Sequence, residues 1–341
     1  MKTLPCLTLA LSLCLASGWA VITLRTSMAQ EATKPAVGPA NQPGADSKKS
    51  EKSASSTGGE KPVTRRNEAS GAVAIVTLEE ARERLINYQS IQAKVMESVS
   101  IGDRQFRLSG SYLQGDGQKQ LTEDGLKLRL EYQVSLGGTE GKLLEVCDGQ
   151  LLWTLQTIGK EQRVTRRNVR QILQAALAAE ATTETVLHAE LGLGGLPGML
   201  ASIQKAVQFE KQWDQDYEGQ AFVVIDGGWK SEVRAKFVGP NASAEQQLPG
   251  FIPDRIRVYF DKASLFPRRI LYLKKNDAQK SLRPMVSIDF TDVETNKPVD
   301  EKAFVFKVPE SVNLQDVTDE YLRLFQKNPT QKNAEADTKK P

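Results

Sequence analysis

Residues 126–136 carry the clearest strand pattern in the sequence and read Leu-Lys-Leu-Arg-Leu-Glu-Tyr-Gln-Val-Ser-Leu. Apolar residues occupy every even position from Leu126 to Leu136, and polar or charged residues occupy the odd positions. Because successive side chains of a β-strand point to opposite faces, this alternation predicts a strand with one dry face and one solvated face. A sheet built from such strands must curl or be covered on its apolar side.

The same period of two recurs on both sides of this stretch. It begins with Ile91, Ala93, Val95, Val99 and Ile101. A Gly102-Asp103 turn then leads into a strand that carries on one face Phe106, Leu108, Gly110 and Tyr112. Shorter examples follow in Ala221-Val223-Ile225, Ile256-Val258-Phe260 and Val286-Ile288-Phe290. These patterns predict a twisted antiparallel sheet with one apolar face.

Several segments with helical spacing supply the cover for that face. Thr77 and Glu80 form a capping box, which predicts a helix over 77–90. Further helices are predicted over 167–187, over Leu196–Val207 with Pro197 near its start, and over Asp316–Gln326. The fold class is therefore α+β, a curved antiparallel sheet covered by helices. The glycines of Gly192–Gly198 provide flexible joints, so the helices either gate a ligand or simply complete the core.

Composition excludes several classes of protein. The 341 residues are 40% hydrophobic, with 45 Lys+Arg against 42 Asp+Glu, so a fibrous, collagen-like or disulfide-scaffold protein is excluded. This near balance of charge gives no support for a nucleic-acid partner.

The N-terminal segment has the features of an export signal. Lys2 precedes an apolar run from Leu4 to Leu24, and Ser27-Met28-Ala29 offers the small residues of a cleavage site. We expect residues 1–29 to be a signal peptide, cleaved after Ala29, for export to the periplasm or cell envelope. The run is long enough to span a membrane, so an uncleaved anchor is the alternative.

The segments that flank the folded region are low in apolar residues. Residues 30–72 contain no Leu, Ile, Phe, Tyr or Trp, and such a chain cannot offset its ordering entropy. We therefore expect 30–76 to be a disordered Pro/Ser/Lys-rich linker, 77–327 to be the folded domain, and 328–341 to be a disordered tail.

Residue types that carry catalysis are few. Cys147 is the only cysteine after the signal, which excludes an intramolecular disulfide in the mature chain, and it is expected to be a half-buried core residue. His188 is the only histidine, no G-x-S-x-G motif accompanies it, and a core or solvated role is favoured over a catalytic one. No catalytic residue is predicted.

Motifs for metals and nucleotides fail on spacing. Asp214-x-Asp216-x-Glu218-Gly219 resembles the opening of a calcium loop, but Ile225 stands where a bidentate glutamate is needed, and a turn between two strands is favoured. Gly192-x-Gly194 and Gly228-Trp229-Lys230-Ser231 lack the spacing of dinucleotide and phosphate loops. No metal or cofactor is predicted. The four arginines Arg163, Arg166, Arg167 and Arg170 form either an anion site or a solvated corner.

Three stretches carry a recognisable set of motifs. They are the helix and strand of residues 81–93, the hairpin of residues 145–153 with its Asp148-Gly149 turn and Trp153, and the closing segment of residues 291–312 with Asn296, Pro298-Val299-Asp300 and Phe304-Val305-Phe306. In this order they resemble the LolA-like family of periplasmic lipoprotein carriers and lipoprotein-binding envelope proteins. The family's Arg-Pro after the first hairpin, whose arginine helps to hold the carrier's lid closed, has no counterpart near Lys119–Leu126, and Ser311 stands where the family commonly has glycine.

The resemblance implies an incomplete, strongly curved, half-open β-barrel with helices over its open side and an apolar cavity inside. It implies a non-enzymatic, exported carrier that holds the acyl chains of lipoproteins or lipids by burial. Such a carrier is expected to be a monomer that exchanges cargo with membrane-bound donor and acceptor proteins. The cavity lining is predicted to be Phe106, Leu108, Leu128, Leu130, Tyr132, Trp153, Ile256, Val258 and Phe260. An ordinary filled core is the alternative role for each of these residues.

Two other functions remain open. The first is an envelope sensor or scaffold of the same superfamily that binds a protein partner. The second is a hydrolase of envelope polymers that uses clustered acids such as Asp214 and Asp216, although no motif supports it.

Overall fold

The computed structural model describes residues 65–101, 104–115, 126–136, 139–178, 191–239, 241, 243, 246–276, 281–310 and 312–325. Its strands are β1 (Arg65–Ser70), β2 (Ser90–Ile101), β3 (Arg104–Gly115), β4 (Lys127–Leu136), β5 (Thr139–Asp148), β6 (Leu151–Ile158), β7 (Glu161–Asn168), β8 (Val207–Tyr217), β9 (Gln220–Trp229), β10 (Arg255–Asp261), β11 (Pro267–Asn276), β12 (Ser281–Thr295) and β13 (Leu314–Asp316). The helices are α3 (Gly71–Asn87), α4 (Val169–Ala178), α6 (Leu191–Ala206), α7 (Ser231–Val238), α8 (Thr318–Phe325) and the 3-10 helix η2 (Glu301–Phe304).

All thirteen strands belong to one sheet, in the order β1-β8-β9-β10-β11-β12-β2-β3-β4-β5-β6-β7-β13. Neighbouring strands pair antiparallel except for β13, which lies parallel to β7. The sheet has β1 and β13 at its two edges and does not close on itself. The predicted fold class, an α+β fold with a curved, half-open sheet under helices, is confirmed.

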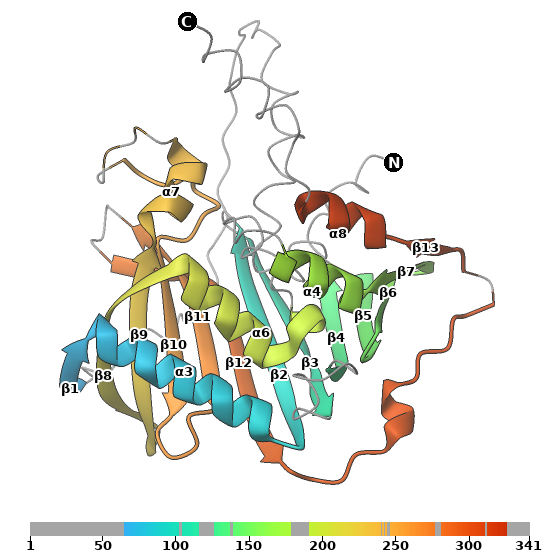
Figure 1. The fold of residues 1–341 in the computed structure, drawn as a ribbon, viewed down its shortest axis with the longest axis horizontal. Helices are drawn as coiled ribbons and strands as arrows, with labels where there is room; N and C mark the ends of the chain where they lie inside the picture. The colour runs from blue at the N-terminus through green and yellow to red at the C-terminus, as the bar shows by residue number, and fades with distance from the viewer. Residues whose placement is uncertain are drawn as a thin grey trace, which may run out of the picture.

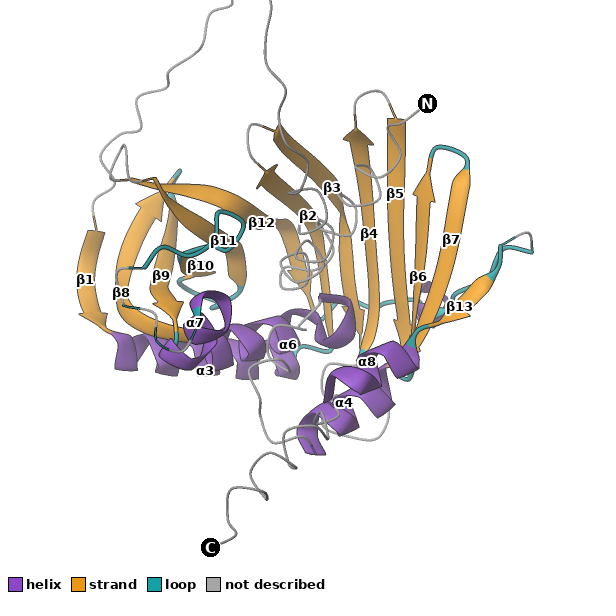
Figure 2. Ribbon diagram, turned by 90° about the horizontal axis from the view of Figure 1, so that it is seen from above, coloured by secondary structure: helices purple, strands orange, loops and turns teal. Residues whose placement is uncertain are grey.

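Helices lie along one side of this sheet. Helices α3 and α6 cross in front of the strands in Figure 1, and in the view of Figure 2 α3, α6, α4 and α8 all lie on the same side. We call this side the helix-covered face and the other side the open face. The main hydrophobic core lies between the helices and the helix-covered face.

The alternation of residues 126–136 decides which face each side chain meets. Leu126, Leu128, Leu130, Tyr132 and Val134 are all buried, whereas the intervening residues are half-buried or exposed. The neighbouring strand β3 follows the same rule, because Leu108, Gly110 and Tyr112 pair with Val134, Tyr132 and Leu130. Gly110 is required there, since a Cβ at this position would lie 1.7 Å from the carbonyl oxygen of Glu131.

Helix α3 begins at Gly71, before the predicted start at Thr77. Strand β1 precedes it directly and pairs with β8. The chain turns so close to β8 that a Cβ on Gly71 would lie 2.0 Å from the carbonyl oxygen of Phe209. Thr77 lies inside the helix and its hydroxyl donates to Gln212 Oε1 at 2.7 Å, so it is not a cap. Described structure therefore begins at Arg65, earlier than the boundary at residue 77 that composition predicts.

The other predicted helices are present with shorter or shifted bounds. Helix α4 covers the first half of the predicted segment 167–187, and residues 179–190, with His188, lie outside the described residues. Helix α8 follows the short strand β13, which the sequence did not predict. The predicted signal peptide 1–29, residues 30–64 of the predicted linker and the predicted tail 328–341 are likewise outside the described residues. Within the described part of the chain, no helix has the length and apolar character needed to cross a membrane.

Two of the turns that resemble the family are built by short polar side chains. Asp148 Oδ1 accepts from the backbone N–H groups of Gln150 and Leu151 and closes the β5–β6 hairpin. Asn296, with a φ of +58°, accepts from the Gln89 N–H through its side chain and so joins the end of β12 to the start of β2. These contacts help to hold β5 against β6 and β12 against β2 within the sheet.

Candidate functional site

Seven of the nine predicted lining residues lie together in the core under the helix-covered face. Their side chains are 0–4% exposed, and they come from β3, β4 and β10, namely Leu108, Leu128, Leu130, Tyr132, Ile256, Val258 and Phe260. Phe106 is half-buried and packs against the same core. The strands β2, β11 and β12 lie between β10 on one side and β3 and β4 on the other. They contribute to the same core Val95, Val99, Ile270 and Ile288.

Trp153 does not join the other eight residues. The β5–β6 hairpin pairs Cys147 with Leu152, and Leu152 is fully buried in the core. Its neighbour Trp153 consequently points to the open face, where its ring stacks on Phe306 with 5.5 Å between centroids. The sequence motif predicted Trp153 as the inward residue, whereas the register of the hairpin directs the adjacent Leu152 inward.

Helix α6 supplies the cover over these residues. Leu196, Met199, Leu200 and Ile203 recur at helical spacing and are 0–5% exposed, because this stripe packs into the core that the sheet residues form. On its other flank Gln204 hydrogen bonds to two residues of α3, accepting from Arg82 Nη1 and donating to Glu79 Oε1, both at 2.8 Å. α6 is thus held by an apolar stripe and a small set of side-chain hydrogen bonds.

A break near the start of α6 lies directly over the sheet. Gly195 has φ +58° and ψ −162°, a backbone conformation that is essentially restricted to glycine. A Cβ at this position would lie 2.6 Å from Leu126 Cδ2 and 2.8 Å from the Tyr112 hydroxyl. Pro197 follows, close to the start of the regular helix, where its missing N–H costs least. The glycine-rich joint predicted from the sequence is therefore a real discontinuity.

Two buried polar side chains of β3 meet this break. The Tyr112 hydroxyl donates to Gln114 Oε1 at 2.6 Å and accepts from the Leu196 N–H at 3.1 Å. Tyr112 is 1% exposed and Gln114 is fully buried. The Nε2 group of Gln114 is a buried donor that has no hydrogen-bond partner among the residues that the structure describes. Burial raises the pKa of Tyr112, so its hydroxyl is neutral.

A carboxyl group also lies in the apolar face. Glu97 of β2 is 3% exposed and stands opposite Leu108 and Ile288. Burial raises the pKa of Glu97 to about 8, an effect that a hydrogen bond from Tyr132 partly offsets. The sequence contained a signal for this residue, because position 97 interrupts the alternation between Val95 and Val99.

The helix-covered face changes character at β5–β7. Glu145 and Arg167 form an ion pair of 3.3 Å with both side chains about 93–94% buried, and the Thr154 hydroxyl donates to Glu145 at 3.1 Å. Arg167 also lies over the Tyr321 ring of α8, 5.0 Å from its centroid. A pair this buried needs its surrounding hydrogen bonds, and α8 with α4 covers it. The apolar region therefore ends at a polar boundary.

This boundary explains most of the arginine cluster predicted as an anion site or a solvated corner. Besides the buried Arg167, Arg163 donates to Gln315 at 2.8 Å and Arg166 to Asp316 at 2.9 Å. These contacts attach β13 to β7, so three of the four arginines have protein partners.

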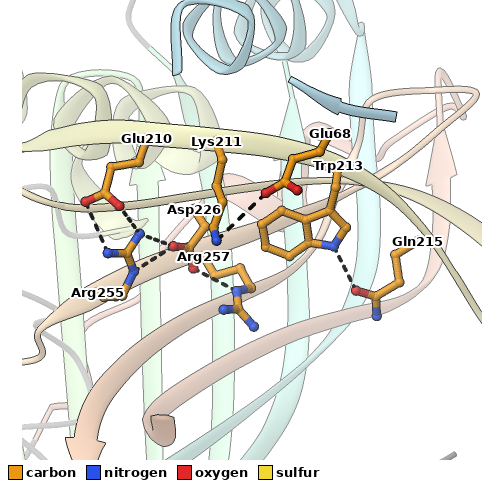
Figure 3. Close-up of polar contacts among 8 residues, drawn as sticks. All are labelled: Glu68, Glu210, Lys211, Trp213, Gln215, Asp226, Arg255 and Arg257. Atoms are coloured by element: carbon orange, nitrogen blue, oxygen red, sulfur yellow. Dashed lines mark hydrogen bonds and ion pairs between the residues drawn. The ribbon is translucent and has the colours of Figure 1, made fainter. Parts of the chain in front are cut away.

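The open face carries a separate cluster around Trp213. Figure 3 shows Asp226 between Arg255 and Arg257, with Glu210 on the far side of Arg255. Arg257 stacks on the Trp213 ring at 5.2 Å, and Trp213 is completely buried beneath it. Phe222, Val224 and Tyr259 complete this second, smaller core. The cluster locks β8, β9 and β10 together from the side opposite to the helices.

Beside this cluster lies a pocket of about 760 Å³. Its wall is mixed, with aromatic, amide and charged side chains that include Tyr217, Phe222, Arg257, Tyr259 and Arg268. A second pocket, of about 430 Å³, lies near α7 and is lined by residues such as Trp229, Arg234 and Lys274. None of the nine predicted lining residues borders either pocket.

The motifs that failed on spacing have structural roles. Glu218 and Gly219, both with positive φ, form the β8–β9 turn, as predicted. Asp214 and Asp216 pair with Lys262 at 2.8 Å and Arg66 at 3.2 Å. Cys147 is 2% exposed rather than half-buried, and burial raises its pKa to about 12. Among the described residues, His, Cys, Asp and Glu side chains form no group of three that could hold a metal ion.

Comparisons with known proteins return only distant structural matches. No family model and no curated protein matches the chain. Among solved structures, LprF from Mycobacterium bovis is 12% identical, with a TM-score of 0.35 over 68% of this chain and 97% of that chain. MucB in complex with MucA is 12% identical, with a TM-score of 0.31 over 68% of this chain and 58% of that chain.

A LolA superfamily protein from Nitrosomonas europaea is 10% identical, with a TM-score of 0.26 over 70% of this chain and 98% of that chain. Matches at these TM-scores assign no role to any residue of this chain. The superfamily that the sequence motifs resemble is thus represented among the solved structures that this chain matches.

Proposed function

We propose that this protein is an exported carrier of the cell envelope that binds the acyl chains of a lipoprotein or lipid between α6 and the helix-covered face. The observation that carries the proposal is the apolar stripe of α6, which packs on an apolar sheet face and begins just after the break at Gly195. A helix attached in this way can move without breaking the sheet beneath it.

The side chains of α6 indicate how a ligand enters. Leu128 and Leu130 are only 1–2% exposed while α6 covers the sheet, so an acyl chain must take the place of α6 side chains such as Met199 and Leu200. Each methylene transferred from water contributes about 0.8 kcal/mol. Such burial has no directional requirement, and we therefore expect tolerance of different chain lengths. No enzymatic step is needed for binding or release.

A lipidated peptide tests the binding. The mature protein should bind a diacylated lipopeptide and not the same peptide without acyl chains, as measured by isothermal titration calorimetry. Leu130→Glu, on the covered face, should abolish binding, whereas Gln133→Glu, exposed on the other face of the same strand, should retain it. Equal loss in both variants, or no binding by the parent protein, would contradict the proposal.

A cross-link tests the movement of α6. Arg82 and Gln204 are in hydrogen-bond contact between α3 and α6, so cysteines at both positions can be joined by a short bis-maleimide. Cys147 should stay unmodified because it is buried and its pKa is raised to about 12. The linked protein should lose lipopeptide binding, and the same double variant without the linker should keep it. Full binding by the linked protein would show that α6 does not have to move.

A second candidate function is a sensor or scaffold that binds a protein partner. The observation in its favour is the open-face pocket, whose tyrosines and arginines are residue types enriched in protein interfaces. This function predicts a stable complex with an envelope protein that forms without lipid and is lost in Tyr217→Ala, since Tyr217 is 45% exposed at this pocket. If the complex forms equally well with the Tyr217→Ala variant, the partner does not bind at the open face.

A further inference from the structure

The unpartnered donor of Gln114 lies where an acyl chain would pass. Gln114 occupies an inward position of β3, opposite Leu128 on one side and Ile91 on the other, and both neighbours are buried apolar residues. The break in α6 lies above it, because a Cβ on Gly195 would come within 3.0 Å of Gln114 Oε1. The side chain is thus at the boundary between the apolar sheet and the joint of its cover.

Tyr112 sets the orientation of the Gln114 amide. Its hydroxyl donates to Oε1 at 2.6 Å, which makes Oε1 the accepting atom and leaves the two N–H donors of Nε2 on the other side of the amide. Tyr112 is itself held by the Leu196 N–H at 3.1 Å. With α6 closed over the sheet, Gln114 is fully buried and its Nε2 group has no acceptor within the described part of the chain. A buried amide donor without an acceptor disfavours the closed state.

The chemistry of this donor selects a type of ligand. Gln114 and Tyr112 are both uncharged, so they match a neutral acceptor better than a phosphate or carboxylate, whose burial would require a compensating charge. An acyl chain joined through an ester or amide carries such an acceptor at its polar end, the carbonyl oxygen. An alkyl ether chain of the same length lacks it.

We propose that Gln114 Nε2 donates to the acyl carbonyl oxygen of the bound lipid, and that Tyr112 is a positioning residue that directs Nε2 toward it. This inference rests on the proposed function and adds a selectivity to it. Hydrocarbon burial alone would bind ester and ether lipids equally, whereas the Gln114 anchor favours the ester because a carbonyl oxygen is a stronger hydrogen-bond acceptor than an ether oxygen.

A matched pair of ligands tests the anchor. Affinities of the mature protein for monopalmitoylglycerol and for its monohexadecyl ether are measured by displacement of a fluorescent fatty-acid probe. We expect the ester to bind about tenfold more tightly than the ether, from one additional hydrogen bond and the relief of an unsatisfied donor. In Gln114→Leu this ratio should fall to about one, while the affinity for the ether is kept.

Two further variants separate the anchor from structural damage. Tyr112→Phe removes the hydroxyl that orients the amide and should lower the ester preference without lowering the affinity for the ether. Gln133→Leu, exposed on the opposite face of β4, should leave the ratio unchanged. If Gln114→Leu still prefers the ester, the proposed hydrogen bond from Gln114 is contradicted, whereas the proposed carrier function is not. Failure of the parent protein to bind either lipid would overturn both.

Discussion

Glu97 occupies an inward position of β2, where the alternation of the strand calls for an apolar residue. Burial raises its pKa to about 8, which means that the folded protein holds this carboxyl protonated at neutral pH. In the unfolded chain the same group ionises near its ordinary value of 4.5. Folding therefore takes up a proton between these two pH values.

The sign of the resulting pH dependence follows from this uptake. Between pH 4.5 and pH 8 the folded state binds more protons at Glu97 than the unfolded state, so the free energy of unfolding falls as the pH rises. The loss is complete above pH 8. Its upper limit is about 5 kcal/mol, since one pKa unit corresponds to about 1.4 kcal/mol.

We predict that Glu97→Gln removes this component of the pH dependence. The variant should match the parent protein near pH 4 and exceed it in stability by several kcal/mol at pH 8, as measured by urea unfolding across that range. Glu140→Gln, at an exposed position of β5, serves as the control and should follow the parent protein at every pH. If the free energies of unfolding of the parent protein and of Glu97→Gln differ by the same amount at pH 4 and at pH 8, the burial of an ionisable carboxyl is contradicted.

At the scale of single residues, the sequence predicted the apolar side chains well and the polar ones poorly. Leu128 and Leu130 follow from their period of two alone. The inward direction of Glu97 could be read from the same period, but its hydrogen bond from Tyr132 depends on a neighbour two strands away. Likewise, the orientation of Trp153 depends on the one-residue register of a hairpin, which a sequence pattern leaves open.

At the scale of elements, α3 shows where composition misleads. The sequence placed the start of order at residue 77 because residues 30–72 lack large apolar side chains. Ala74, however, continues the buried stripe of Leu78, Ala81 and Leu85, and β1 gains its stability from pairing with β8. Backbone hydrogen bonds between strands separated by more than a hundred residues leave no trace in local composition.

Two shortened chains test the contribution of β1 and the first turn of α3. A protein that begins at residue 77 should unfold at least about 2 kcal/mol more easily than one that begins at residue 65, because several hydrogen bonds of about 1 kcal/mol each are lost from β8. The protein that begins at residue 65 should match one that begins at residue 30. Equal stability of the two shortened chains would contradict a structural role for β1.

At the scale of the whole molecule, the order of the strands joins the two halves of the chain. β12 pairs with β2 and thereby connects β8–β12, on one side, to β3–β7 on the other. The helix-covered face is continuous across this junction, from Val258 through Ile288 and Val95 to Leu130. The sequence predicted the strands on either side but not this adjacency, since alternation shows which face a residue meets and not which strand lies beside it.

The continuity of that face would allow the proposed movement of one helix to expose a site for a long ligand. α3 is tied to the sheet edge through β1 and β8, whereas α6 has the Gly195 break near its start, packs its apolar stripe into the core and leads directly into β8. A chain inserted below α6 would therefore meet apolar side chains in both directions. The buried Glu145–Arg167 pair marks the limit of this apolar region toward β7.

The acyl chain is proposed to lie beneath α6, and photochemical cross-linking measures its location directly. A lipid with a diazirine in its acyl chain is bound to the mature protein and irradiated, and the labelled peptides are identified by mass spectrometry. We predict labels on β4 near Leu128 and Leu130 and on α6 between Met199 and Ile203. Labels confined to the open face around Tyr217 and Tyr259 would contradict binding beneath α6.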